Sequence, residues 1–335
     1  MKTVLTLLIL SLALTASAEE KHFGVIKQLT AGGTNAEAYW SPDGTKIVFQ
    51  TTREPYQCDQ IFVMNADGSD QHLVSTGKGR TTCGYFYPDG KHIIYASTHE
   101  AGAQCPPGVD RSKGYLWPVY ETFEMYKATL DGKIVGKVSA HPGYDAEATI
   151  NWKTKKMVWT SERGGDLDLW VSNLDGSGAR KVTDGVGYDG GAFFSWDGKK
   201  LVWRASHPST PEGAKDYKEK LAQHVTAPMK MEIFVSDSDG KNAKRITDFG
   251  CASFAPAFTP DGKKIIFASN KNVCDSRNFE LFLMNPDGSG LEQVTSSGGF
   301  NSFPMFSPDG KKLLFVSDRQ AKGRYEFNVF VAEWQ

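Results

Sequence analysis

The feature that most constrains this chain is a short motif that recurs six times. Its clearest copy reads FSPDGKKLLF at residues 306–315, a Pro-Asp-Gly turn between two apolar runs. Proline presets φ and glycine accepts positive φ, so each copy predicts a strand, a tight turn and a second strand. The copies span residues 39–49, 86–95, 150–159, 194–203, 258–267 and 306–315. The third copy, INWKTKKMVW, keeps the flanking strands without the Pro-Asp-Gly.

A second motif follows each of the first five copies. It is a strand ending in Asp-Gly, such as IFVMNADGS, and it leads into a short outer strand such as LEQVT, so each unit holds four strands. The aligned turn positions Asp43, Asp89, Lys153, Asp197, Asp261 and Asp309 are spaced by 46, 64, 44, 64 and 48 residues. Four-stranded units at this spacing are typical of a β-propeller. The two long spacings predict insertions at about 100–120 and 208–228.

The two ends of the chain predict how the ring closes. The sixth unit stops after its third strand, but IKQLT at residues 26–30 matches the outer strands of the other units. We therefore expect an all-β, six-bladed β-propeller of four-stranded blades whose last blade is completed by the N-terminal strand.

The first residues have the pattern of a secretory signal peptide. Lys2 precedes an apolar run at 4–14 and the small residues at 16–18, which predicts a signal peptide at 1–18 and a mature propeller domain at 19–335. We expect a periplasmic or secreted protein. No later apolar run approaches the length of a membrane span, so none is predicted. A formal net charge of -1 gives no reason to expect a nucleic-acid partner.

Cysteine usage fits an oxidising compartment. Cys251 and Cys274 belong to loops on the same face of blade five, so a disulfide between them is expected. Cys83 occupies the comparable place in blade two, and either Cys58 or Cys105 could pair with it. An odd count of five leaves at least one thiol unpaired within the chain.

Two aligned rings of polar residues flank the loop between the second and third strands. Ten residues after each turn stand basic or imidazole side chains, namely Arg53, His99, Arg163, His207, Lys271 and Arg319. The third strand begins with Gln60, Glu124, Asp168, Glu232, Glu280 and Asn328. Because these strands are antiparallel, the rings should face each other. We favour one structural charge pair per blade, with a functional cationic ring as the alternative.

Blades two to four carry the candidate binding pocket on this loop face. His99 and His207 directly precede the insertions, and the intervening inner strands begin with carboxylates. The candidates are His99, His141, Asp145, Glu147, Arg163, Asp189 and His207. Such ligand types suit Zn, Mn or Ca, but the spacing matches no metal motif. We therefore predict no cofactor and keep a divalent metal as the alternative. Without a metal, the histidines would only donate hydrogen bonds to loop carbonyl groups.

The insertions differ in character. The first is rich in Gly and Pro and carries Tyr115, Trp117 and Tyr120, which could lay a stacking surface over the pocket. The second predicts a short helix capped by Thr210, with Pro211 at its first position. Either insertion could be a lid, a partner surface or ordinary packing against the blades.

The repeating unit has this order of parts: a hairpin like SPDGKKIVF, a strand, an NxDGS turn, and a strand that ends in LT. This order resembles the TolB-like, WD-repeat-like propeller family. The resemblance covers the mature chain, but the α/β domain that precedes the propeller in TolB itself is not expected here. It implies a binding scaffold or adaptor whose loop face holds an envelope protein or a peptidoglycan-linked partner. No Gly-x-Ser-x-Gly nucleophile motif occurs. The alternative is a metal-dependent enzyme, a lyase or hydrolase, or a small-ligand receptor. Its site would lie over blades two to four and use His99, His207 and Glu147.

Overall fold

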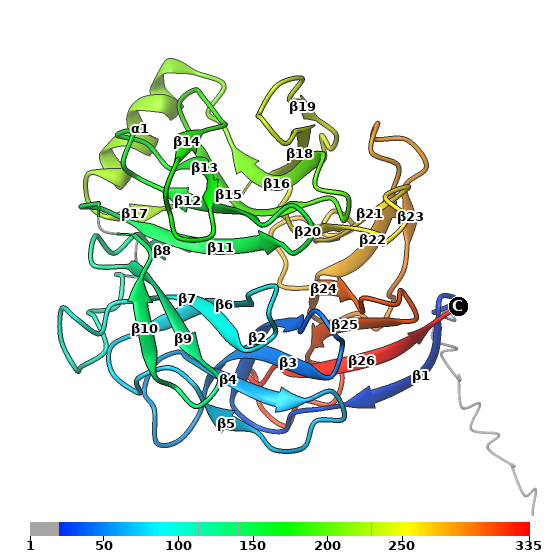
Figure 1. Cartoon of the computed structure of the whole chain (residues 1–335). Helices are drawn as coiled ribbons and strands as arrows, with labels where there is room; N and C mark the ends of the chain where they lie inside the picture. The colour runs from blue at the N-terminus through cyan, green and yellow to red at the C-terminus, as the bar shows by residue number, and fades with distance from the viewer. Residues whose placement is uncertain (1–19, 111, 113, 140, 229) are drawn as a thin grey trace, which may run out of the picture.

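The computed structural model describes residues 20–335 except 111, 113, 140 and 229. The expected signal peptide at 1–18 lies outside the described residues. Six four-stranded antiparallel sheets surround a central channel, and the predicted six-bladed β-propeller is confirmed (Figure 1). We call the face where the inner strands begin the upper face, and the face that carries the Pro-Asp-Gly hairpins the lower face.

Each blade runs outward from its inner strand. Blade one contains β2 (Thr34–Trp40), β3 (Lys46–Thr52), β4 (Gln60–Asn65) and β5 (His72–Leu73). Blade two contains β6 (Thr81–Phe86), β7 (His92–Ser97), β9 (Glu124–Thr129) and β10 (Ile134–Lys137). Blade three contains β11 (Asp145–Asn151), β12 (Lys156–Ser161), β13 (Asp168–Asn173) and β14 (Arg180–Lys181).

The other three blades repeat this order. Blade four contains β15 (Tyr188–Phe194), β16 (Lys200–Ser206), β18 (Glu232–Asp237) and β19 (Lys244–Arg245). Blade five contains β20 (Ser253–Phe258), β21 (Ile265–Ser269), β22 (Glu280–Met284) and β23 (Glu292–Gln293). Blade six contains β24 (Asn301–Phe306), β25 (Lys312–Ser317), β26 (Asn328–Trp334) and β1 (Phe23–Gln28).

The ring is closed by the two ends of the described chain. Strand β1 pairs antiparallel with β26, with Gln28 opposite Phe330 and Lys27 opposite Val331. The two strands lie side by side in Figure 1, blue beside red. The prediction that the N-terminal strand completes the last blade is confirmed, and β1 gives blade six the same four strands as the other five blades.

The hairpin chemistry explains why the turn motif recurs. Asp43 accepts hydrogen bonds from the Ser41 hydroxyl at 2.6 Å and from the Thr45 amide at 3.0 Å. These bonds hold the turn and lower the pKa of Asp43, the Ser41 bond contributing most. In the third hairpin, Asn151, which aligns with Ser41, takes over this role and accepts from the Thr154 amide at 2.8 Å. A side chain that bonds its own turn therefore survives even where Pro-Asp-Gly is lost.

Every inner strand contains an irregularity at the same place. The register shifts once in each inner hairpin, as between Ala36 and Tyr39 in blade one. At that point stand Glu37, Cys83, Glu147, Gly191, Ala255 and Phe303, and all six have positive φ, between 47° and 61°. Such bulges re-aim a side chain, and positive φ is uncommon outside glycine. We call these six residues the bulge ring, since all of them line one narrow part of the channel.

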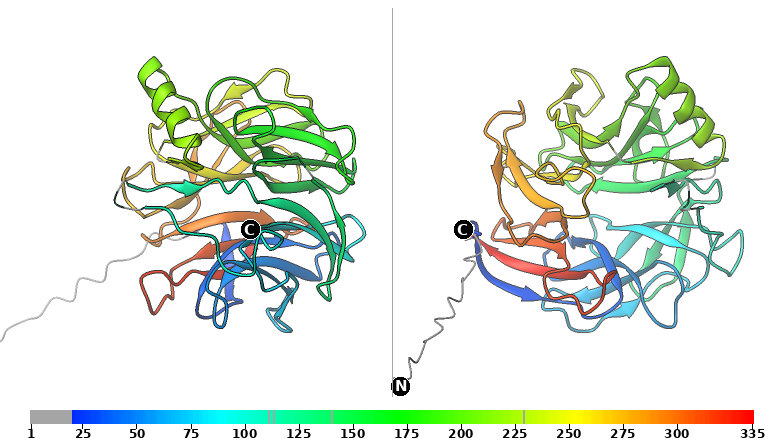
Figure 2. Two further views of the ribbon diagram at one scale, coloured as in Figure 1. Left: turned by 90° about the vertical axis from the view of Figure 1, so that its left-hand side faces the viewer. Right: turned by 180° about the vertical axis from the view of Figure 1, so that it is seen from behind.

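The two insertions contact each other. The first forms β8 (Trp117–Pro118), and the second forms α1 (Pro211–Leu221) and β17 (Val225–Thr226). Strands β8 and β17 pair antiparallel, with Trp117 opposite Thr226. The predicted cap is confirmed, because the Thr210 hydroxyl oxygen accepts from the Gly213 amide at 3.0 Å. Helix α1 projects from the rim of the propeller (Figure 2).

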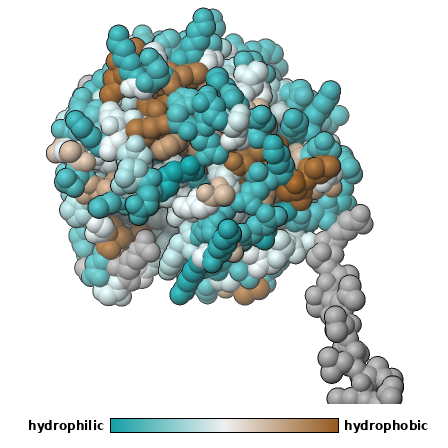
Figure 3. All heavy atoms as spheres, turned by 90° about the horizontal axis from the view of Figure 1, so that it is seen from below, coloured by the Kyte–Doolittle hydropathy of each residue, from teal (hydrophilic) through white to brown (hydrophobic). Residues whose placement is uncertain are grey.

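The exterior of the propeller has no membrane-spanning helix among the described residues and is largely polar on the side shown in Figure 3. Within the described part of the chain, no helix has the length and apolar character needed to cross a membrane. On the side that lies at the bottom of the view in Figure 1, the surface is mostly hydrophilic, with hydrophobic patches that are separated from one another (Figure 3).

The disulfides correct one prediction. Cys251 pairs with Cys274, as expected. The expectation that Cys83 pairs with Cys58 or Cys105 is wrong, because Cys58 and Cys105 pair with each other. Cys83 is a buried free thiol of the bulge ring. Its bulge turns it toward the channel, whereas the other two cysteines lie in loops of the upper face.

Candidate functional site

Glu147 is the centre of a buried polar network at the upper end of the channel. Its carboxylate accepts from Arg204 Nη2 at 2.5 Å, from the Tyr188 hydroxyl at 2.9 and 3.0 Å, and from the Gly191 amide at 2.9 Å. The Thr160 hydroxyl donates at 2.7 Å. The network joins blade three to blade four, since Glu147 and Thr160 belong to one and the remaining donors to the other. A carboxylate with this many donors is held in one position.

Arg204 is a site residue that the sequence patterns did not reveal. It is only 7% exposed, and its Nε and Nη2 donate to the Tyr188 hydroxyl at 3.1 and 2.7 Å. Burial alone would lower the pKa of Arg204, but Glu147 and Tyr188 raise it above its usual value. Its guanidinium lies 5.2 Å from the Trp117 ring centroid, so the first insertion covers the ion pair from above.

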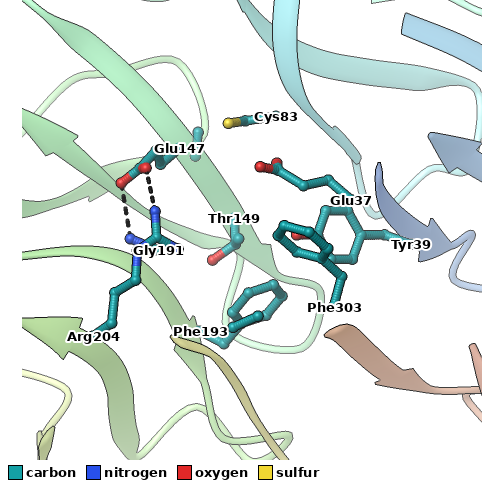
Figure 4. Close-up of a pocket in the computed structure, with 11 residues that line it drawn as sticks. Glu37, Tyr39, Cys83, Glu147, Thr149, Gly191, Phe193, Arg204 and Phe303 are labelled. Atoms are coloured by element: carbon teal, nitrogen blue, oxygen red, sulfur yellow. Dashed lines mark hydrogen bonds and ion pairs between the residues drawn. The ribbon is translucent and has the colours of Figure 1, made fainter. Parts of the chain in front are cut away.

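Glu37 and Cys83 lie across the channel from this ion pair. In Figure 4 they face Glu147 and Arg204 across a gap that measures only about 20 Å³, which suits one water molecule. Burial raises the pKa of Glu37 to about 7, and Cys83 and Arg204 oppose that rise. Burial, together with Glu37 and Glu147, raises the pKa of the Cys83 thiol well above its usual value. The cluster thus holds a carboxyl that exchanges its proton near neutral pH.

A sequence signal for this cluster existed. The bulge ring is the aligned position six residues before each turn, where the repeat reads Glu, Cys, Glu, Gly, Ala and Phe. The candidates predicted from sequence included Glu147 as part of the upper pocket and omitted Glu37. Simple strand alternation misplaces the ring, because each bulge inserts one extra residue and changes the face that follows.

Asp145 and Asp189 are held within their own blades. Asp145 accepts from Trp159 Nε1 at 2.9 Å and from Arg163 Nη2 at 3.0 Å. At the aligned position of blade four, Asp189 accepts from Trp203 Nε1 at 2.6 Å and lies 3.0 Å from His207 Nε2. The hydrogen bond to Asp189 is the main cause of the raised pKa of His207.

These contacts correct the expected pairing of the two polar rings. Arg163 and His207 contact the start of the inner strand, and Arg53 likewise donates to Asn35 at 2.8 Å. The residues that begin the third strands instead accept hydroxyl groups that follow the outer strands. These pairs are Ser75 with Gln60, Ser139 with Glu124, Thr183 with Asp168, Thr247 with Glu232, Thr295 with Glu280, and Thr30 with Asn328. Arg53, Arg163 and His207 turn inward because the inner strands of their blades offer them buried acceptors.

His99 and His141 lie apart from the network. His99 Nδ1 is 3.0 Å from the Ser97 hydroxyl, its ring lies 4.4 Å from that of Tyr126, and burial lowers its pKa. His141 is exposed, with Nδ1 2.7 Å from the Pro142 carbonyl oxygen. Within the residues that the structure covers, no group of three His, Cys, Asp or Glu side chains is arranged to hold a metal ion.

The fold and its repeat define a six-bladed β-propeller. Residues 210–329 match the family model described as TolB beta propeller domain. The putative TolB from Agrobacterium tumefaciens is 17% identical with a TM-score of 0.60, and the alignment covers 92% of this chain and 97% of that one. TolB from Acinetobacter baumannii is 16% identical with a TM-score of 0.57, covering 90% of this chain and 65% of that one.

An enzyme shares the same fold. An oligogalacturonate lyase in complex with manganese is 15% identical with a TM-score of 0.52, and the alignment covers 92% of this chain and 79% of that one. No curated protein is significantly similar in sequence. At these identities the similarities establish the fold and not the role of this chain.

Proposed function

We propose that the protein is an exported binding scaffold that holds an envelope protein or a peptidoglycan-linked partner on its upper face. The observation that carries the proposal is the construction of the two insertions. They pair with each other through β8 and β17, and the disulfide between Cys58 and Cys105 ties the first of them to blade one. Long loops fixed in this way present a preorganised surface, which reduces the entropy lost on binding.

The chemistry of the upper mouth supports binding over catalysis. Glu147, Asp145 and Asp189 each meet two or more donors of the protein itself. Their arrangement fixes the shape of the mouth, and Arg204, the partner of Glu147, packs against Trp117 of the first insertion. The exposed Tyr115, whose hydroxyl accepts from Trp117 Nε1 at 3.0 Å, provides an aromatic contact of the kind that is enriched at interfaces.

Cross-linking in the envelope fraction tests the proposal. Tagged mature protein would be compared with Tyr115→Ala and with a control, Tyr325→Ala, which removes an equally exposed tyrosine (55% against 56%) from a loop of blade six. We expect a defined partner that is captured by the wild type and by Tyr325→Ala and is depleted with Tyr115→Ala. Failure of the wild type to capture a partner, or equal capture by all three proteins, would contradict the proposal.

A second candidate function is favoured by the Glu37 cluster. A partly buried carboxyl with a pKa of about 7, beside a thiol and an arginine, has the properties of a general acid or base. The corresponding proposal is a metal-dependent enzyme, a lyase or hydrolase, or a small-ligand receptor, whose site lies over blades two to four and extends to Glu37 of blade one. Metal analysis of the purified protein, followed by a screen of acidic sugars for turnover by wild type and Glu37→Gln, distinguishes it from the scaffold. Turnover that Glu37→Gln abolishes would replace the scaffold proposal.

A further inference from the structure

The lower mouth of the channel contains a second cavity, distinct from the bulge ring. Its volume is about 290 Å³, near the lower end of the range for small-molecule sites. It is lined by the last residues of the inner strands and by hairpin residues of blades three and four, with Tyr85, Phe193 and Phe306 among its aromatic side chains. The predicted pocket of the upper face does not include it.

Three departures from the hairpin repeat converge on this cavity. The position after the first turn residue is proline in four blades, Pro42, Pro88, Pro260 and Pro308. In blades three and four it is Trp152 and Trp196, and the next residue of blade three is Lys153 where the other five blades have aspartate. All three substituted side chains line the cavity. Turn geometry does not require them, since Ser195 and Asp197 make the same hydroxyl-to-carboxylate bond, 2.6 Å, as Ser41 and Asp43.

The two tryptophans are held in place by their indole N–H groups. Trp152 Nε1 donates to the Phe86 carbonyl at 2.9 Å, and Trp196 Nε1 donates to the Phe258 carbonyl at 3.1 Å. The two rings meet edge to face with centroids 6.2 Å apart, and Trp152 lies 5.8 Å from Tyr85. Each indole N–H is thus satisfied by a neighbouring blade. The preorganised aromatic surfaces remain for a flat ring or a face rich in C–H groups.

Lys153 selects the charge of the ligand. It is exposed at the edge of the cavity and makes no hydrogen bond or ion pair with any residue that the structure describes. A lysine at this position repels cations, which aromatic pockets otherwise attract, and favours anions. Asn151 and the Tyr85 hydroxyl, which has no partner among the described residues, add polar groups to the lining.

We propose that this lower cavity binds a small carboxylate whose body is a single six-membered ring. The aromatic residues hold the ring and Lys153 binds the carboxylate. Two sources share this chemistry, an aromatic acid and an acidic sugar, and the test separates them. The site is independent of the partner surface on the upper face.

Calorimetric titration of the mature protein tests the site with two carboxylates, phenylacetate and glucuronate, and with their uncharged counterparts, 2-phenylethanol and glucose. We expect at least one carboxylate to bind the wild type more tightly than its uncharged counterpart. Binding of phenylacetate alone assigns an aromatic acid, and binding of glucuronate alone assigns an acidic sugar. Two variants restore the repeat, Lys153→Asp and Trp196→Pro, and each should weaken binding about five- to tenfold.

The control Lys91→Asp makes the same charge change on the hairpin of blade two, outside the cavity, and should bind like the wild type. Lys153→Asp alters only an exposed side chain, so it keeps the test valid even if Trp196→Pro disturbs the hairpin. Three results would each overturn the proposal: no heat of binding with either carboxylate up to about 10 mM, equal binding of charged and uncharged probes, or unchanged binding by Lys153→Asp.

Discussion

The charged side chains at the two mouths of the channel differ in whether they have partners within the protein. At the upper mouth, Glu147 and Arg204 meet each other and several further partners, and the first insertion covers them. At the lower mouth, Lys153 has no hydrogen-bond or ion-pair partner among the described residues, and Trp152 and Trp196 line a cavity. Side chains that satisfy one another stabilise a structure, whereas side chains left without partners at a concave surface indicate a ligand. The comparison therefore assigns rigidity to the upper mouth and recognition of a small molecule to the lower one.

The largest expected effect tests the rigidity of the upper mouth. Arg204→Met leaves the buried Glu147 carboxylate without its counter-ion, so we expect the free energy of unfolding to fall by about 3–5 kcal/mol. Urea denaturation measures it. Adding Glu147→Gln should recover much of the loss, because the double variant contains no unpaired charge. A double variant as unstable as Arg204→Met would mean that the ion pair is not what stabilises this mouth.

The next effect is the pH dependence caused by Glu37. Its pKa is raised from 4.5 to about 7, so the folded state binds the proton more tightly than the unfolded state. The stability associated with the protonated form is complete below pH 4.5 and is lost as the pH rises through about 7. Glu37→Gln should remove this slope and be more stable than the wild type at about pH 8, by up to about 3 kcal/mol. Thermal unfolding across the pH range measures it, and parallel curves for the two proteins would contradict the assignment.

A smaller effect is expected at the lower mouth. Trp196→Pro removes one hydrogen bond and part of an aromatic contact but inserts the residue that four other hairpins have. We expect the free energy of unfolding to fall by no more than about 1–2 kcal/mol. Urea denaturation again provides the value. A loss as large as that of Arg204→Met would make Trp196 a structural brace and remove the contrast between the mouths.

The smallest effects come from the aligned histidines, and they should have opposite signs. His207 has a raised pKa, so its contribution to stability is present below the unfolded pKa and is lost as the pH rises through the folded one. His99 has a lowered pKa, so its protonation destabilises the fold as the pH falls. Lowering the pH should increase the destabilisation by His207→Gln and decrease that by His99→Gln. Both differences should stay below about 1 kcal/mol, because solvent screens these partly exposed rings.

Urea denaturation of both variants at several pH values measures these differences in the free energy of unfolding. A pH dependence of the same sign for the two histidines would show that their different partners do not set their titration.

Much of the fold followed from local sequence. The turn residues marked all six hairpins, the unmatched strand at 26–30 predicted the closure, and Thr210 marked the start of α1. These features depend on a few neighbouring residues whose backbone preferences are strong. The pairing of Cys251 with Cys274 could also be predicted from the sequence, since both residues belong to one blade.

The residues of the candidate site were harder to predict from the sequence, because the site depends on how separate blades pack together. Arg204 lies on a second strand, and only the packing of blades three and four shows that it reaches Glu147. The pairing of Cys58 with Cys105 depends on the path of the first insertion. Glu37 was the exception, because alignment of the six repeats would have marked its position once a bulge was considered.

The closure of blade six also constrains how the protein folds. Strand β1 pairs with β26, so residues near 28 must meet residues near 330. This contact is the most distant in sequence that the ring requires, and distant contacts have the largest loop-closure entropy and slow folding. During synthesis, β1 cannot pair until β26 has been made, so the ring closes only at the end. Blade six should therefore be the last blade to acquire protection from hydrogen exchange on refolding, although one of its strands is the first to be made.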